Sequence, residues 1–206
     1  MITGPVRGLV TLALACAALA RAGAQDPRIG PRLDAPSRAA ITALLDSARA
    51  QGLPVEPLME KVYQGFAVGA DGPRIVAAVR SLSVDMASAH RALGTVASAN
   101  EIKAAASAMH AGVPAVELGK MKKQSGLRRS LTLPFTVLAD IVSRGVPVET
   151  AANAIRSLMG AGAKDADLTK FQRNVSVDIE QGAPPAAAAE TRAKGAVPAT
   201  KPEGDG

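Results

Sequence analysis

Aromatic residues make up only 2% of this chain of 206 residues, and tryptophan is missing altogether. The four aromatic side chains are Tyr63, Phe66, Phe135 and Phe171. β-Sheets are rich in aromatic and β-branched residues, whereas alanine and leucine favour helices. The shortage of aromatics therefore favours a core of closely packed helices. It also argues against a surface that stacks the bases of single-stranded nucleic acid.

Cysteine is represented by Cys16 alone, which lies within an apolar run over residues 8–20. A short basic segment precedes this run, and the small residues of 22–24 follow it, which is the three-part pattern of a secretory signal peptide. We predict a signal peptide over residues 1–24, with 18–20 as a second candidate cleavage site. Lipid attachment at Cys16 is not expected, because Ala13 replaces the leucine that lipoprotein signals carry three residues earlier.

Cleavage after residue 24 would leave a chain without cysteine, which excludes disulfides, a thiolate nucleophile and cysteine-bound metal. The full chain has 24 basic and 18 acidic residues, for a net charge of +6. Cleavage removes Arg7 and Arg21, so the charge becomes 22 minus 18, or +4. This weak basicity is far from that of a dedicated nucleic-acid binder, and we do not expect nucleic acid as a partner.

Helical spacing of apolar residues dominates the rest of the chain, and its longest stripe runs from Ile75 to Leu93. Ser98 and Glu101 have the spacing of a capping box, and Asp165 is suited to an N-cap. We predict an all-α fold, an irregular array or a bundle of about eight short helices. The single domain is expected over residues 34–193, after a mobile lead-in at 25–33 and before a disordered tail at 194–206.

Recurring Gly-x-Pro corners separate these helical patterns. Glycine ends a helix in the left-handed conformation at little cost, and proline fits the first turn of the next helix. We predict helix–corner–helix hairpins joined at these positions. The corners are Gly52 with Pro54, Gly145 with Pro147 and, more loosely, Gly112 with Pro114 and Gly182 with Pro184.

A shift of 93 residues aligns 52–86 with 145–179 without a gap, with identities that include Ser83, Val84 and Asp85 against Ser176, Val177 and Asp178. We interpret this as a duplicated hairpin of a stacking helical repeat. The repeated aspartates are expected to contact neighbouring helices.

Candidate catalytic groups are few. His90 and His110 fall on different predicted helices, and we expect surface or capping roles for both rather than metal binding or acid–base chemistry. Asp165 and Asp167 stand at a helix start, where capping explains them. No phosphate-binding loop or nucleophile motif is present. We therefore expect no enzyme activity, no cofactor and no metal site.

Acidic residues are absent between Glu117 and Asp140, whereas five basic residues crowd the same region. They are a candidate anion-binding segment, although a solvated charged face would look the same. The five are Lys120, Lys122, Lys123, Arg128 and Arg129.

These patterns predict an exported, non-enzymatic α-helical interaction or scaffold protein of a bacterial cell envelope, located in the periplasm or outside the cell. Its expected partner is another envelope protein. The alternative is a protein that binds anionic lipid or a polyanionic polymer through the basic segment at 120–129.

Overall fold

The computed structural model describes residues 32–126 and 129–196, and within these ranges it contains nine α-helices and no strand. The predicted all-α fold is confirmed, whereas the predicted signal peptide lies outside the described residues. The helices are α1 (Ala35–Ala50), α2 (Glu56–Ala67), α3 (Gly72–Leu93), α4 (Ala99–His110), α5 (Ala115–Ser125), α6 (Thr132–Ser143), α7 (Val148–Gly160), α8 (Asp165–Glu180) and α9 (Pro185–Ala196).

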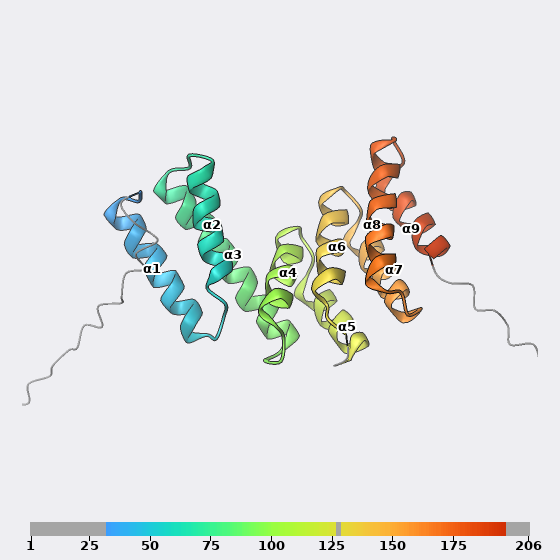
Figure 1. The fold of residues 1–206 in the computed structure, drawn as a ribbon, viewed down its shortest axis with the longest axis horizontal. Coiled ribbons are helices and arrows are strands. Elements are labelled where there is room, and N and C mark those ends of the chain that lie inside the picture. Colours follow the sequence, from blue (N-terminus) through green and yellow to red (C-terminus); the bar gives the residue numbers. More distant parts are fainter. Residues whose placement is uncertain (1–31, 127–128, 197–206) are drawn as a thin grey trace, which may run out of the picture.

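The helices form an elongated array of two rows, with α1 and α9 at opposite ends (Figure 1). In one row α1 packs on α3, α3 on α5, α5 on α7 and α7 on α9. In the other, α4 packs on α6 and α6 on α8, and an ion pair between Glu60 and Lys103 links α2 to α4. Contacts such as α3 with α4 and α8 with α9 join the rows. The arrangement is therefore an open array and not a closed bundle.

Alanine allows the centre of this array to pack tightly. The described core is aliphatic apart from Phe135 and Phe171, which are fully buried. In α4, the alanines at 104, 105, 106 and 108 are all buried, and this helix packs closely on both α3 and α6. Small side chains let helix axes approach, so an aromatic-poor sequence can still build a dense interior.

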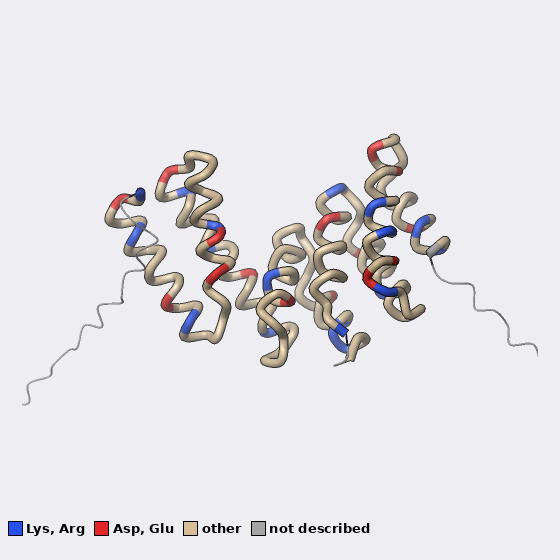
Figure 2. Tube along the Cα trace, in the orientation of Figure 1, with Lys and Arg blue, Asp and Glu red and all other residues tan. Residues whose placement is uncertain are grey.

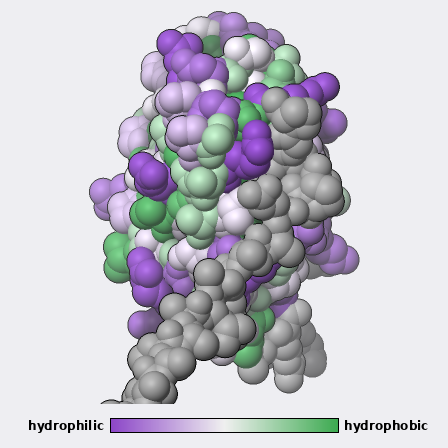
Figure 3. All heavy atoms as spheres, turned by 90° about the vertical axis from the view of Figure 1, so that its left-hand side faces the viewer, coloured by the Kyte–Doolittle hydropathy of each residue, from purple (hydrophilic) through white to green (hydrophobic). Residues whose placement is uncertain are grey.

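The α1 end of the array has a mixed surface. Seen from that end, hydrophobic residues are spread in small areas among hydrophilic ones (Figure 3). Charges of both signs are likewise distributed along the array (Figure 2). A terminal helix with a partly polar outer face is what an open stack needs to stay soluble, because no further helix covers it.

Each of the eight connections between described helices contains one glycine with a positive φ angle. Four are the glycines of the Gly-x-Pro corners, and the other four have no proline two residues later. At Gly145 φ is +92°, and the N–H of Val146 donates to the Ile141 carbonyl at 3.1 Å. This is the hydrogen bond of a Schellman cap. It folds Val146, which is buried, back against the last turn of α6. The positive-φ glycines are Gly52, Gly69, Gly94, Gly112, Gly126, Gly145, Gly162 and Gly182.

Replacing Gly145 by Ala is expected to lower the free energy of unfolding by about 1 kcal/mol. A methyl group there would meet only Pro185, at 3.6 Å, so the cost comes from the left-handed backbone and not from crowding. Urea titration followed by circular dichroism measures it. Gly119→Ala, inside α5 and with space for a methyl group, is the matched control and should be neutral or stabilising. Equal midpoints for Gly145→Ala and wild type would contradict the argument.

The two copies of the 93-residue duplication pack differently. α2 and α3 pack on each other, whereas α7 and α8 each pack more closely on α6 and α9. The repeated aspartates do contact neighbouring helices, as predicted. Asp85 lies 3.6 Å from the Nδ1 atom of His110 in α4, and both carboxylate oxygens of Asp178 accept hydrogen bonds of 2.6 Å from Arg192 in α9.

Substituting these two aspartates by Asn is expected to have opposite effects. Burial raises the pKa of Asp85, so its contribution to stability is present at acid pH and is lost as the pH rises through its folded-state pKa. The hydrogen bond from Arg192 lowers the pKa of Asp178, so its contribution is present at neutral pH and is lost as the pH falls. Asp85→Asn should stabilise the protein near about pH 7, and Asp178→Asn should destabilise it. When free energies of unfolding are measured from about pH 7 down to about pH 3, the difference between each variant and wild type should become smaller.

Both edges of the predicted domain extend further than expected. Leu33, assigned to the mobile lead-in, is buried at 3% exposure. Arg32 stacks over the ring of Phe66, 5.7 Å from its centroid, which helps to hold this segment. At the other end α9 continues to Ala196, so residues 194–196 are helical and not part of a tail. The remaining tail residues, 197–206, lie outside the described residues.

The start of α6 contains a proline, and the start of α8 differs from prediction. α6 begins at Thr132, so Pro134 lies inside its first turn; this is tolerated because a first-turn N–H has no helical acceptor. α8 begins at Asp165, which is therefore not the N-cap. Asp167 instead accepts a hydrogen bond of 2.8 Å from the N–H of Lys164. The capping box of Ser98 and Glu101 is present as predicted.

Candidate functional site

A groove of about 700 Å³ lies between α3, α4 and α5, and we call it the basic groove. Its charged lining residues are all cations, and the rest of its lining is mainly small or apolar. The lining residues are Ser88, Arg91, Ala92, Met109, Ala115, Val116, Gly119, Lys120 and Lys123.

Helical spacing brings these side chains together. In α3, the longest helix described, residues 88, 91 and 92 are separated by three and four positions and share one face. In α5, Ala115, Gly119 and Lys123 recur every four residues along the face toward α3. Gly119 has no side chain, and an added Cβ would meet only the carbonyl oxygen of Ala92, at 3.8 Å. Gly119 therefore contributes only backbone atoms to the groove lining.

The cations of the basic groove retain unused hydrogen-bonding capacity. The Nζ of Lys120 lies 2.6 Å from an Oε of Glu117, and the other carboxylate oxygen of Glu117 accepts from Arg156 in α7. The hydrogen bond from Lys120 is the main cause of the lowered pKa of Glu117. An ammonium group has three donors, so one bond to Glu117 leaves two on Lys120. Arg91 donates a hydrogen bond to the Ser88 hydroxyl at 2.9 Å, and its guanidinium group has further N–H donors.

Apolar surface is exposed next to these cations. Val116 is 62% exposed. Met109 is half-buried at the other wall. The basic groove thus combines an apolar floor with a positively charged rim, and this combination suits an anionic ligand that also has an apolar part.

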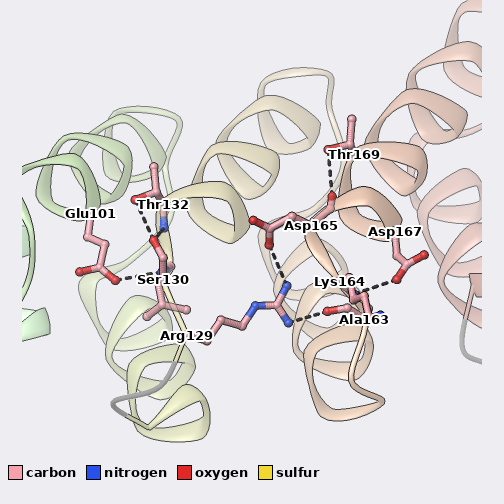
Figure 4. A network of polar contacts seen from close by, with 10 residues as sticks. Glu101, Arg129, Ser130, Thr132, Ala163, Lys164, Asp165, Asp167 and Thr169 are labelled. Carbon is pink, nitrogen blue, oxygen red and sulfur yellow. Dashed lines mark hydrogen bonds and ion pairs between the residues drawn. The ribbon is translucent and has the colours of Figure 1, made fainter.

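The five predicted basic residues do not form one site. Lys120 and Lys123 line the basic groove, whereas half-buried Lys122 helps to lower the pKa of Glu101. Arg129 donates hydrogen bonds to the Ala163 carbonyl at 2.6 Å and to Asp165 at 3.3 Å (Figure 4). It therefore binds the connection between α7 and α8. Arg128 lies outside the described residues.

Arg91 was not identified from the sequence. It is 29 residues before Lys120, and its own surroundings in α3 resemble those of any solvated arginine on a helix. Only the close packing of α3 on α5 brings it to the groove. No local pattern could have shown this juxtaposition.

A second hollow, of about 490 Å³, lies between α8 and α9 and has a less selective lining. Asp167, Lys170 and Arg192 line it, so both charge signs are present. Arg192 is also engaged by the two oxygens of Asp178. Asp167 accepts from the N–H of Lys164, so two of the three charged groups already have partners within the protein, which makes this hollow a poorer candidate.

The two histidines lie on different helices, His90 in α3 and His110 in α4. His110 is in the last turn of α4, and its charged partner is Asp85 on α3. In residues 32–126 and 129–196 there is no group of three or more His, Cys, Asp or Glu residues placed to hold a metal ion. Among the helices described, none is both long and apolar enough to cross a membrane.

Comparison of the chain with protein-family models, with curated proteins and with solved structures found no match. What can be inferred about function therefore rests on the chain's own geometry and charge.

Proposed function

We propose that this protein is an exported, non-enzymatic scaffold of a bacterial cell envelope, and that its helical array holds another protein. The single observation that carries the proposal is the basic groove, an open surface with exposed apolar residues and cations that still have free donors. The signal-peptide pattern of residues 1–24 supports export. The 93-residue duplication and the Gly-x-Pro corners support an array that grew by repetition of helical hairpins.

The architecture is suited to binding. In a two-row array each helix packs on near neighbours only, so both sides remain available to a partner. Interhelical ion pairs connect neighbouring helices, including Arg156 with Glu117 between α7 and α5 and Arg144 with Glu180 between α6 and α8. A preorganised surface loses less entropy when it binds, which favours affinity.

Binding of anionic lipid or a polyanionic polymer is the second candidate, because Lys120 and Lys123 face an open groove. The contacts of Arg129 with Ala163 and Asp165 weigh against it, since they engage one of the five cations internally. Replacing Lys120, Lys122, Lys123, Arg128 and Arg129 by Ser tests this alternative. Loss of vesicle binding would favour it, and unchanged binding would reject it.

The scaffold proposal is tested with the purified protein immobilised and exposed to solubilised envelope extract. We expect one protein to bind saturably, to co-elute with the scaffold in size-exclusion chromatography and to be displaced by free scaffold. In parallel, generic ester, peptide and glycan substrates should show no turnover. Turnover without any displaceable partner would reject the proposal.

A further inference from the structure

We propose that the basic groove binds an acidic segment of the partner protein, with carboxylates at the rim and aliphatic side chains on the floor. This inference rests on the proposed function and specifies the chemistry of the partner. The basic groove has three cationic side chains and no carboxylate among its lining residues. It is therefore complementary to a segment in which Glu or Asp alternates with aliphatic residues.

The floor provides the apolar half of this recognition. Ala92, Ala115 and Gly119 are small, so a leucine-sized side chain laid in the groove can contact them and Met109 at the same time. Exposed Val116 would be covered at the same time. Covering apolar surface supplies the main driving force of association, at about 25 cal/mol per Å².

The rim provides the polar half. Lys120 already binds the carboxylate of Glu117 at 2.6 Å, which shows that a carboxylate fits beside its ammonium group. Arg91 presents a planar guanidinium that can bind a carboxylate through two hydrogen bonds. Lys123, one turn beyond Gly119, is exposed and can pair with a second acid. Acids on both sides of one aliphatic anchor are therefore the expected pattern.

A peptide fits this surface better than a phospholipid does. The basic groove is open along its length, so an acyl chain placed in it would remain largely in contact with water. A peptide needs only single side chains in the floor, and its backbone tolerates exposure to water. The lipid is kept as an explicit outcome of the test.

The test uses a fluorescein-labelled peptide of about twelve residues in which Glu and Leu alternate. Two matched probes replace all Glu by Gln, or all Leu by Ser. Fluorescence anisotropy with the full chain should show binding of the Glu–Leu peptide and at least about tenfold weaker binding of either matched probe. Raising the salt from about 0.05 M to about 0.5 M should also weaken binding, because the rim pairs are exposed.

Two variants locate the binding. The triple variant Arg91→Ser, Lys120→Ser, Lys123→Ser should weaken peptide binding at least about tenfold. A control triple variant, Arg80→Ser, Lys170→Ser, Arg173→Ser, removes the same charge from exposed positions elsewhere and should bind as wild type. Gly119→Leu fills the floor without changing the charge and should also abolish binding, whereas Gly119→Ala should retain it. Circular dichroism confirms that each variant is folded.

Equal loss in the two triple variants would overturn the inference, because general charge and not the groove would then be responsible. Full binding by Gly119→Leu would overturn it as well. Binding to phosphatidylglycerol vesicles but not to the Glu–Leu peptide would assign the groove to lipid. If the groove variants still capture the displaceable envelope partner as wild type does, the scaffold proposal stands and the groove inference fails.

Discussion

Replacing Glu101 by Ala is expected to lower the free energy of unfolding by about 3 kcal/mol. Glu101 is 7% exposed, and its two carboxylate oxygens accept from the N–H groups of Ser98 and Leu131, each at 2.9 Å. The alanine variant leaves both donors without this partner, and the Leu131 bond spans 30 residues to join the start of α4 to the start of α6 (Figure 4). Chemical denaturation of the purified variant measures the loss.

Two companion variants separate the contributions. Ser98→Ala removes only the cap of α4 and should cost about 1 kcal/mol. Glu101→Gln keeps one acceptor oxygen and should fall between Ser98→Ala and Glu101→Ala. A cost for Glu101→Ala no larger than that for Ser98→Ala would mean that the bond to Leu131 contributes nothing.

Acid should diminish the effect of removing Glu101. Burial tends to raise the pKa of this carboxyl, but the hydrogen bonds from Leu131 and Ser98 outweigh it, and the pKa is lowered overall. Its contribution to stability is therefore present above the unfolded-state pKa and is lost as the pH falls through the folded-state pKa. The difference in the free energy of unfolding between wild type and Glu101→Ala should therefore become smaller as the pH falls through the folded-state pKa.

Replacing Gly65 by Ala is expected to destabilise the protein by about 1 to 2 kcal/mol. Gly65 lies inside α2, where alanine is normally the better residue by about 1 kcal/mol. Here an added Cβ would come within 3.0 Å of Cδ1 of Ile75 and would overlap Cγ1, which belongs to the stiff stem of that buried side chain. Urea denaturation with circular dichroism measures the difference.

The sign of this effect should reverse once Ile75 is shortened. In an Ile75→Ala background the overlap is gone, and Gly65→Ala should then stabilise the protein by about 1 kcal/mol. The double-mutant cycle isolates the contact between α2 and α3. Additive effects would show that the glycine is not needed for close packing of these helices.

Local signals allowed the helices to be predicted well. The apolar stripe from Ile75 to Leu93 and the capping box at Ser98 depend on neighbours within a few turns, so the sequence alone contains them. The role of Asp165 could not be predicted in the same way. Its carboxylate meets Arg129, 36 residues away, and that contact depends on how α6 and α8 pack.

The candidate site depended still more on packing. The absence of acids in this region led us to predict Lys120, Lys123 and Arg129 as parts of one anion-binding segment. In the structure Lys120 and Lys123 line the groove, whereas Arg129 binds the α7–α8 corner. A charge run cannot tell a cation that faces a groove from one that binds a backbone carbonyl. Arg91 completes the rim only because α3 is long enough to reach α5.

The two-row arrangement has a consequence for the duplicated sequence. A shift of 93 residues maps α3 onto α8, five helices further along, and five is an odd number. Equivalent helices therefore fall in opposite rows, and the exposed valines Val84 and Val177 belong to different rows. In a chain lengthened by further copies at this spacing, each helix of the unit would lie in one row in one copy and in the opposite row in the next, so equivalent side chains would face opposite sides of the array in successive copies.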